Sequence, residues 1–293
     1  CLNKAKGAIR LNINWYPGHM AKSKRLMANS VRLVDMILEI RDARVPISSA
    51  NPDFDELFTH KYRMIILNKS DVADPTITKD WVDWFSMQGI KAIPVNSLDS
   101  AEISRLKSDI KKIADKFHRE TIEKKGIRKV VRGMVTGIPN VGKSAFINGI
   151  AGANKAKTGN KPGVTRINQW IRVDSYLELM DTPGLLWPKL DNREVALNLV
   201  FSRTIKEEIL DIEEAAHYFL EKAKNEFPEA ITARYGKLDM QKKGHEILEG
   251  ICYKKGWIKS KGAPDFKRGS KHLLGDFQQG RLGRISLESP PEA

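Results

Sequence analysis

The sequence predicts an α/β fold in which helices cover both faces of a mostly parallel sheet, followed by a small domain built only of helices. Two observations support this. Short apolar runs typical of buried strands alternate with amphipathic segments as far as about residue 200, as in parallel sheets. Beyond about residue 205, apolar residues recur at helical spacing. We therefore expect two domains, residues 12–200 and 201–293.

Each expected element follows from its local pattern. Short apolar runs predict strands at residues 34–40, 63–67, 90–95 and 129–136. Apolar residues at spacings of three and four predict helices at residues 76–87 and 103–117. Residues 169–173 and 176–180 flank Asp174-Ser175 and predict a hairpin. A further helix is expected at about residues 144–149.

Positive charge is concentrated in two separated regions. The chain carries 50 Lys and Arg against 36 Asp and Glu, a net charge of +14. Many of the basic residues fall within residues 1–32 and 241–284. Such a layout favours an extended polyanion such as nucleic acid, because counterion release supplies affinity. A solvated basic surface without a partner is the alternative.

The remaining composition is that of a cytoplasmic protein. Neither Cys1 nor Cys252 belongs to a zinc motif or a disulfide framework. No apolar run approaches the roughly 20 residues needed to cross a bilayer, and no secretory leader is visible. We therefore expect a cytoplasmic monomer without membrane contact.

A phosphate-binding loop is predicted at Gly137-Ile-Pro-Asn-Val-Gly-Lys-Ser144, which fits GxxxxGK[ST] between an expected strand and an expected helix. Its glycines let backbone amides wrap phosphates, and the helix N-terminus adds its dipole. Lys143 is expected to reach the β- and γ-phosphates, and Ser144 to bind Mg²⁺. Further contacts are expected from Asn140, Val141 and Gly142. The motif does not specify the base.

A guanine-reading loop is predicted at residues 68–71, which follow an expected strand and match NKxD. The Asp71 carboxylate can accept from guanine N1–H and the exocyclic amine together, whereas adenine has no donor at N1. Lys69 can lie over the base, and Asn68 can tie this loop to the phosphate loop. A polar turn is the alternative. Asn96 and Ser97 occupy the place of a supporting base-contact loop.

Two switch elements are predicted after the phosphate loop, one at Thr165 and one at residues 181–184. Asp181-Thr-Pro-Gly184 matches DxxG. Asp181 is expected to hold Mg²⁺ through water, and the Gly184 amide to sense the γ-phosphate. Thr165 is expected to complete the Mg²⁺ shell only when that phosphate is present; otherwise it is a turn residue.

The order of these motifs is unusual, because the guanine-reading loop precedes the phosphate loop. The loops can still meet if the ends of the usual sheet are joined and the chain is broken elsewhere, which exposed connections tolerate. The sequence therefore predicts a circularly permuted P-loop GTPase domain.

The chain resembles the circularly permuted GTPases of ribosome biogenesis. The match runs through residues 15–22, Asp42-Ala-Arg44, the loops above, residues 181–188 and Gly283-Arg-Ile-Ser286. The resemblance implies a GTPase in late maturation of the large (50S) ribosomal subunit, with a C-terminal helical domain that contacts ribosomal RNA. Arg166 departs from the pattern, since a second Thr or another small polar residue is expected after Thr165.

Hydrolysis is expected to need a residue other than Leu185 to orient the attacking water. Leu185 follows DxxG, where many GTPases place a Gln that orients water. The resemblance points instead to His19, whose imidazole can order water or move a proton; a packed turn histidine is the alternative. In related GTPases the Asn that corresponds to Asn140 binds K⁺. The alternative is that Asn140 is an inert loop residue.

Two functions therefore remain open from the sequence. The first is a GTPase assembly factor that uses GTP, Mg²⁺ and K⁺ and is stimulated by the large subunit. The second is a nucleotide-gated RNA-binding switch with little hydrolysis, which Leu185 favours. Asp71 argues against an ATPase.

Overall fold

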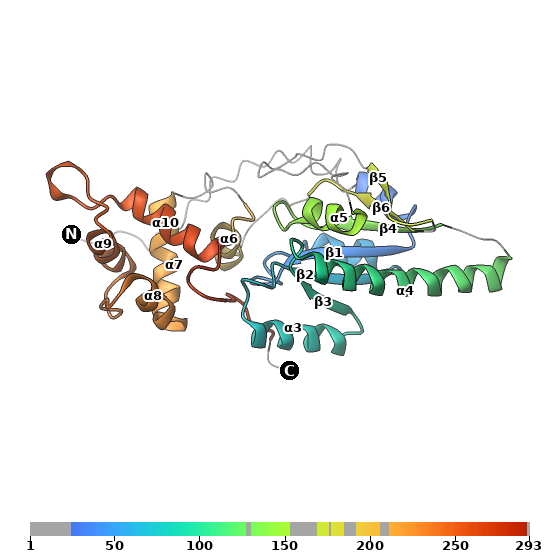
Figure 1. The fold of residues 1–293 in the computed structure, drawn as a ribbon, viewed down its shortest axis with the longest axis horizontal. Helices are drawn as coiled ribbons and strands as arrows, with labels where there is room; N and C mark the ends of the chain where they lie inside the picture. Colours follow the sequence, from blue (N-terminus) through green and yellow to red (C-terminus); the bar gives the residue numbers. More distant parts are fainter. Residues whose placement is uncertain are drawn as a thin grey trace, which may run out of the picture. The chain divides into compact units, whose positions relative to one another are not determined.

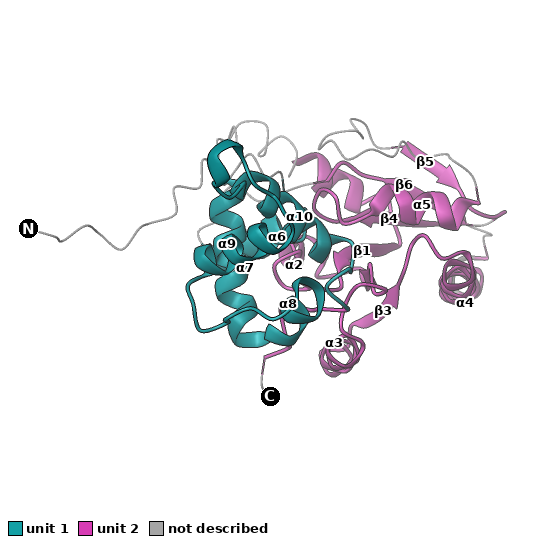
Figure 2. Ribbon diagram, turned by 60° about the vertical axis from the view of Figure 1, so that its left-hand side comes forward, with its two compact units in different colours: residues 1–15, 189–283 teal, residues 16–188, 284–293 magenta. Residues whose placement is uncertain are grey.

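The computed structural model of the chain describes residues 25–126, 130–152, 169–175, 177–184, 192–205 and 211–291. They belong to two compact units (Figure 2). The sheet unit comprises residues 16–188 and 284–293, and the helical unit comprises residues 1–15 and 189–283. The structure therefore differs from the sequence-based division at residue 201, and it assigns the C-terminal segment to the sheet unit.

Within the described residues, six strands form one sheet at the centre of the sheet unit (Figure 1). Its spatial order is β3-β2-β1-β4-β6-β5, and its neighbouring strands are parallel except for the antiparallel pair β5 and β6. The predicted mostly parallel sheet is confirmed. The strands are β1 (Met36–Asp42), β2 (Tyr62–Asn68), β3 (Lys91–Val95), β4 (Val131–Thr136), β5 (Gln169–Arg172) and β6 (Leu177–Asp181).

Two long helices of the sheet unit begin at capping carboxylates. Asp74 precedes α3 (Pro75–Met87) and Asp99 precedes α4 (Ser100–Lys125), and each side chain accepts hydrogen bonds from two amides of the first turn. Helix α4 ends at Gly126, whose left-handed φ of 65° suits glycine. The sequence predicted a shorter helix, because the last turns of α4 are mostly polar and carry little apolar periodicity.

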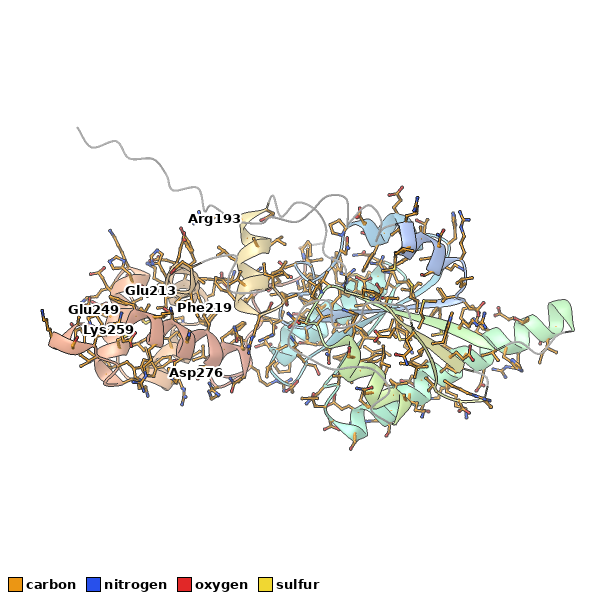
Figure 3. All side chains as sticks on the ribbon, turned by 90° about the horizontal axis from the view of Figure 1, so that it is seen from above. Arg193, Glu213, Phe219, Glu249, Lys259 and Asp276 are labelled. Carbon is orange, nitrogen blue, oxygen red and sulfur yellow. The ribbon has the colours of Figure 1, made fainter. Side chains whose placement is uncertain are left out.

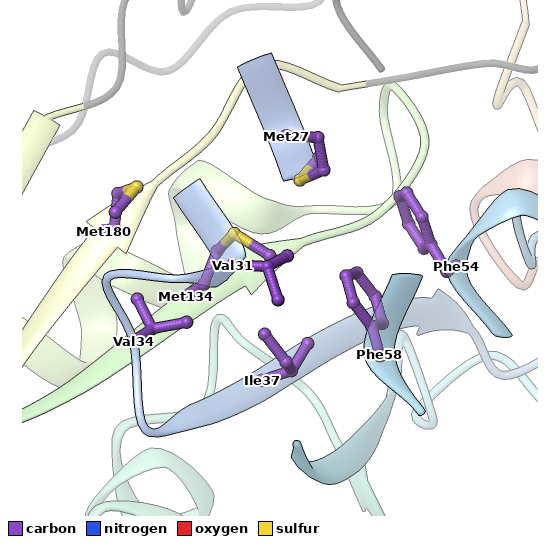
Figure 4. Packing of buried hydrophobic residues seen from close by; sticks show 8 residues of the cluster. All are labelled: Met27, Val31, Val34, Ile37, Phe54, Phe58, Met134 and Met180. Carbon is purple, nitrogen blue, oxygen red and sulfur yellow. The ribbon is translucent and has the colours of Figure 1, made fainter. Parts of the chain in front are cut away.

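A hydrophobic cluster packs two helical segments against the sheet (Figure 4). Helix α2 (Asp53–Phe58) contributes Phe54 and Phe58, whose ring centroids are 4.9 Å apart. Helical residues 25–31 contribute Met27 and Val31. The remaining members are Val34, Ile37, Met134 and Met180. Helix α2 was not expected from the sequence, because six residues are too few to show a helical period.

The helical unit is built around α7 (Ile212–Glu226), which packs against the other helices of the unit. These are α6 (Arg193–Phe201), α8 (Pro228–Tyr235), α9 (Gly244–Lys254) and α10 (Phe266–Gln278). Phe219 of α7 lies 5.3 Å from Phe201 and 5.1 Å from Phe277, measured between ring centroids. Helix α6 thus belongs to the helical unit because its last residue completes this aromatic core.

A buried carboxylate holds α8 against α10. Asp276 accepts hydrogen bonds from Arg234 Nε at 2.6 Å, Tyr235 OH at 2.9 Å and Arg281 Nε at 2.5 Å. Figure 3 shows Asp276 and Phe219 within this unit. Burial favours the neutral acid, but these hydrogen bonds and the charge of Arg234 keep the pKa of Asp276 below its usual value. None of the described helices combines the length and apolarity that a membrane crossing requires.

Candidate nucleotide-binding site

The predicted nucleotide loops follow the carboxyl ends of neighbouring parallel strands. The guanine-reading loop follows β2, the supporting loop follows β3, the phosphate loop follows β4 and the DxxG segment ends β6. These strands run in one direction within a single sheet, so their carboxyl ends share one edge. Ligands of open α/β sheets bind at that edge. The permuted chain order therefore still brings the four loops to one edge of the sheet.

Asn68 joins three of these loops with one side chain. Its Nδ2 donates to the carbonyl of Val141 in the phosphate loop at 2.7 Å. Its Oδ1 accepts from the amide of Ser97 in the supporting loop at 3.1 Å. Asn68 is only 3% exposed, so both bonds are shielded from water. Asn96 shapes the supporting loop locally, since its Oδ1 accepts from the Leu98 amide at 2.9 Å.

Gly142 lets the phosphate loop approach the guanine-reading loop. A Cβ at this position would lie 2.1 Å from Asn68 Nδ2, a distance that no side chain could occupy. Its φ of 100° also disfavours other residues. Gly142 is the N-cap of α5 (Lys143–Ala151), so the loop leads directly into a helix N-terminus that favours phosphate. Asn140 has a left-handed φ of 59°, which Asn tolerates better than most residues.

Lys143 lies inside the phosphate loop. It is 9% exposed, and its Nζ donates to the Ile138 carbonyl at 2.8 Å. Burial lowers the pKa of Lys143 to about 8, although the negative charge of Asp181 opposes this shift. A bound phosphate would favour the charged amine. The Lys143 amine thus lies inside the predicted phosphate loop, next to the carboxylate of Asp181.

The DxxG segment passes directly over the phosphate loop. A Cβ at Gly184 would lie 2.8 Å from Lys143 Nζ and 2.9 Å from the Pro139 Cα. Thr182 fixes the preceding backbone, since its Oγ1 donates to the Val135 carbonyl at 2.8 Å. Only glycine therefore fits where this segment meets the loop, as expected for a γ-phosphate sensor.

The oxygen groups at this edge fit a magnesium ion held mainly by a nucleotide. Asp181 is 2% exposed at the end of β6, and its charge acts on Lys143 of the phosphate loop. Ser144 lies in the first turn of α5. Mg²⁺ commonly uses one or two protein oxygens together with phosphates and water. Among the described residues, no group of three or more His, Cys, Asp or Glu could hold a metal by itself.

The sequence did not reveal what holds Lys69. Its Nζ donates to Asp42 Oδ2 at 2.9 Å, and Arg44 donates to both oxygens of the same carboxylate at 2.9 and 2.8 Å. Asp42 is fully buried at the end of β1. Burial alone would raise the pKa of Asp42, but the charges of Arg44 and Lys69 hold it far below its usual range. The sequence signal that could have pointed to Asp42 was the triplet Asp42-Ala-Arg44 at the carboxyl end of a buried strand.

Several predicted residues lie outside the part of the chain that the structure describes. They are His19, Thr165, Arg166 and Leu185. The site geometry above therefore comprises the guanine-reading, supporting and phosphate loops and the DxxG segment.

Comparison with known proteins decides the family. A family model described as 50S ribosome-binding GTPase matches residues 132–234. The ribosome biogenesis GTPase A of Bacillus cereus is 39% identical over 282 residues, which cover 96% of this chain and 95% of that protein. This chain belongs to the ribosome biogenesis GTPase A family. The resemblance seen in the sequence is thereby confirmed.

Solved structures of a relative agree with this assignment. The GDP-bound YlqF structure is 26% identical, covers 92% of this chain and all of that chain, and has a TM-score of 0.64. The GNP-bound YlqF from T. maritima is also 26% identical, covers 93% of this chain and all of that chain, and has a TM-score of 0.63. The protein is accordingly a GTPase of ribosome biogenesis with a circularly permuted P-loop domain, and it binds guanine nucleotides.

Proposed function

We propose that this GTPase acts in late maturation of the large ribosomal subunit, and that the subunit stimulates GTP hydrolysis. The main observation that supports this proposal is a basic surface on the helical unit, called here the α9–α10 surface. It consists of exposed residues at the end of α9, in the following loop and on α10: Lys254, Lys255, Lys259, Lys261, Lys267, Arg268 and Lys271. Lys259 is labelled in Figure 3.

The α9–α10 surface also carries an aromatic pair suited to RNA. Trp257 stacks on His272 with ring centroids 4.5 Å apart and an interplanar angle of 16°. The Arg268 guanidinium lies 6.0 Å from the Trp257 ring centroid. Cations can contact phosphates, and an exposed ring can stack on an unpaired base. This combination supports ribosomal RNA as the partner more than a merely solvated surface.

The nucleotide roles follow from the positions of the loops. Lys143 and the amides of the phosphate loop bind the phosphates, and Asp71 accepts from the guanine base. Ser144 and, through water, Asp181 would hold Mg²⁺, and Thr165 would join them in the GTP state. Bound Mg²⁺ offsets the negative charge of the phosphates.

Water activation falls to residues beyond these loops. Leu185 has no polar atom that could orient a water molecule, so we assign that role to His19, whose imidazole can accept a proton. Asn140 is assigned to K⁺, which would supply positive charge near the phosphates. One chain supplies all these groups, which supports action as a monomer, and we propose the cytoplasm as its location.

The test is GTP turnover in K⁺ buffer, with and without large ribosomal subunits. We expect strong stimulation by the subunit, which His19→Ala abolishes. Stimulation that survives His19→Ala would remove His19 from the mechanism. Turnover that the subunit does not change would contradict the proposed stimulation and leave a slow binding switch. Replacing K⁺ with Na⁺ in the same assay tests Asn140, and equal rates would remove K⁺ from the proposal.

The α9–α10 surface is tested separately by binding to large-subunit RNA at several salt concentrations. Neutralising Lys259, Lys261 and Arg268 to Ala should weaken binding and flatten its salt dependence, because up to three counterion-releasing contacts are lost. Lys112→Ala on the exposed face of α4 is the matched control. Equal salt dependence in the triple variant and the wild type would place the RNA contact elsewhere.

A further inference from the structure

We infer that the C-terminal segment, residues 284–288, positions the guanine-reading loop, and that Arg284 is a positioning residue for recognition of the base. This inference rests on the proposed contact between Asp71 and guanine. In this segment the chain passes from the helical unit back into the sheet unit. No expected sequence motif for base recognition includes these residues.

Arg284 and its neighbour hold the backbone of the loop on both sides of Asp71. Arg284 Nη2 donates to the Ser70 carbonyl at 2.8 Å, and Arg284 Nε donates to the Ala73 carbonyl at 2.9 Å. The Ile285 amide donates to the Val72 carbonyl at 3.1 Å. The residue before Asp71 and the two that follow it are therefore all held by the C-terminal segment.

The same segment also fixes the end of the loop. Asp74, which caps α3, donates its backbone amide to Ser286 Oγ at 3.1 Å. Ile285, Ser286 and Leu287 are all buried. A buried hydroxyl that loses its partner would remain unsatisfied, so this bond resists opening.

The segment is itself anchored to the sheet unit beyond the loop. The Glu288 carboxylate accepts from the Ile47 amide at 2.7 Å and the Ser48 amide at 3.0 Å. The indole Nε1 of Trp81, a fully buried residue of α3, donates to the Glu288 carbonyl at 3.0 Å. These contacts make the segment a fixed support for the loop.

Lys69, the other base-contact residue of the loop, is connected to this support. The Leu287 amide donates to the Arg44 carbonyl at 2.9 Å. Arg44 in turn holds the Asp42 carboxylate, which accepts from Lys69 Nζ. The C-terminal segment therefore reaches both Lys69 and the backbone around Asp71.

Asp71 depends on this backbone support. It is exposed, and within the described part of the chain its carboxylate accepts no hydrogen bond. Lys69, two residues earlier, has a left-handed φ of 61°. The direction of the Asp71 carboxylate is thus set by the loop backbone. A carboxylate that reads two donors at once requires a defined direction, because each hydrogen bond weakens steeply with angle.

The segment is joined directly to the helical unit. Gly283 is the last residue of that unit and Arg284 is the first residue of the returning chain. A single peptide bond therefore links the helical unit to the residue that supports the guanine-reading loop.

The test compares nucleotide affinities of the full-length protein with and without these contacts. GDP, IDP and ADP are the probes, because IDP lacks only the exocyclic amine and ADP has no N1 donor. The variants are Arg284→Ala, Arg284→Lys and Ser286→Ala. Arg105→Ala is the matched control, since this exposed arginine of α4 bonds only to the carbonyl of Ala101 within its own helix.

We expect Arg284→Ala to weaken GDP binding about tenfold and Ser286→Ala about threefold, given the usual strength of such hydrogen bonds. ADP binding should not change, because it uses the phosphate loop alone, so the preference for GDP over IDP and ADP falls. Arg284→Lys should restore part of the loss, and Arg105→Ala should match the wild type. Ser286→Ala, which removes one neutral contact, carries the test if Arg284→Ala does not fold.

Two failures are distinguishable. Wild-type protein that binds GDP no more tightly than ADP would refute the proposed role of Asp71. Wild-type protein that prefers GDP, with the same preference in the Arg284→Ala and Ser286→Ala variants, would refute the role of the C-terminal segment and leave that of Asp71 intact. Equal losses of GDP, IDP and ADP affinity in the Arg284→Ala and Ser286→Ala variants would also refute the role of the C-terminal segment, because they would indicate a general effect on the fold.

Discussion

Replacing Asn68 should damage both stability and nucleotide binding, because one side chain joins three loops. In Asn68→Ala, the buried Val141 carbonyl and the Ser97 amide both lose their partner. Each buried polar group left without a partner costs about 1–3 kcal/mol. The two together predict a loss of about 2–4 kcal/mol in the free energy of unfolding, since some water can enter the space left by the side chain.

Asn68→Asp separates the two bonds. The carboxylate can still accept from the Ser97 amide, but it cannot donate to the Val141 carbonyl and places a charge against it. We expect a loss of about 2–3 kcal/mol, at least as large as the loss of one bond. A loss close to that of Asn68→Ala would therefore show that the remaining bond to Ser97 does not hold the loops together by itself.

The assay is urea unfolding of nucleotide-free protein, followed by GDP titration of each folded variant. Asn225→Ala is the control, because this exposed Asn donates only to the Glu221 carbonyl one helical turn away. It should change the unfolding free energy by less than about 0.5 kcal/mol. An Asn68→Ala protein with wild-type stability and wild-type GDP affinity would refute the claim that Asn68 holds the loops together.

Three further predictions follow from the described geometry. Gly184→Ala should reduce GTP affinity about tenfold or more and GDP affinity less, because a Cβ 2.9 Å from the Pro139 Cα would push the Gly184 amide away from the γ-phosphate, which only GTP carries; equal losses of GTP and GDP affinity would contradict this. GDP affinity should fall as pH rises through about 8, since the free amine of Lys143 must then take up a proton on binding; isothermal titrations showing constant affinity up to about pH 9 would contradict it. Asp276→Ala should lower the unfolding free energy of the helical unit by about 2–3 kcal/mol, a value reduced because Arg234 and Arg281 are each 41% exposed; an unchanged urea midpoint would contradict it.

Much of the fold was predictable because its signals are local. The strands of the sheet are short apolar runs, and the phosphate loop lies between a strand and a helix as its motif requires. The ends of the elements were less certain, since the polar last turns of α4 carry little apolar period. Helix α2 was too short to recognise.

The contacts within the site were less predictable because they join distant parts of the chain. The triplet Asp42-Ala-Arg44 is visible locally but does not indicate Lys69 as its partner, and nothing local to Arg284 indicates that it bonds to the carbonyl of Ser70. The extent of the helical unit is also not visible locally, since Phe201 belongs to that unit through its contact with Phe219. Such pairings depend on three-dimensional packing that one sequence does not encode in any visible pattern.

The most direct test of the account is whether the loop that follows β2 reads the base of the nucleotide held by the loop that follows β4. Xanthine carries a carbonyl where guanine carries its exocyclic amine, so an Asn amide at position 71 would complement xanthine as the Asp carboxylate complements guanine. We would measure GTP and XTP binding to wild-type protein and to Asp71→Asn. The account predicts that the wild type prefers GTP and that Asp71→Asn prefers XTP. An Asp71→Asn protein that keeps the wild-type preference for GTP would contradict it.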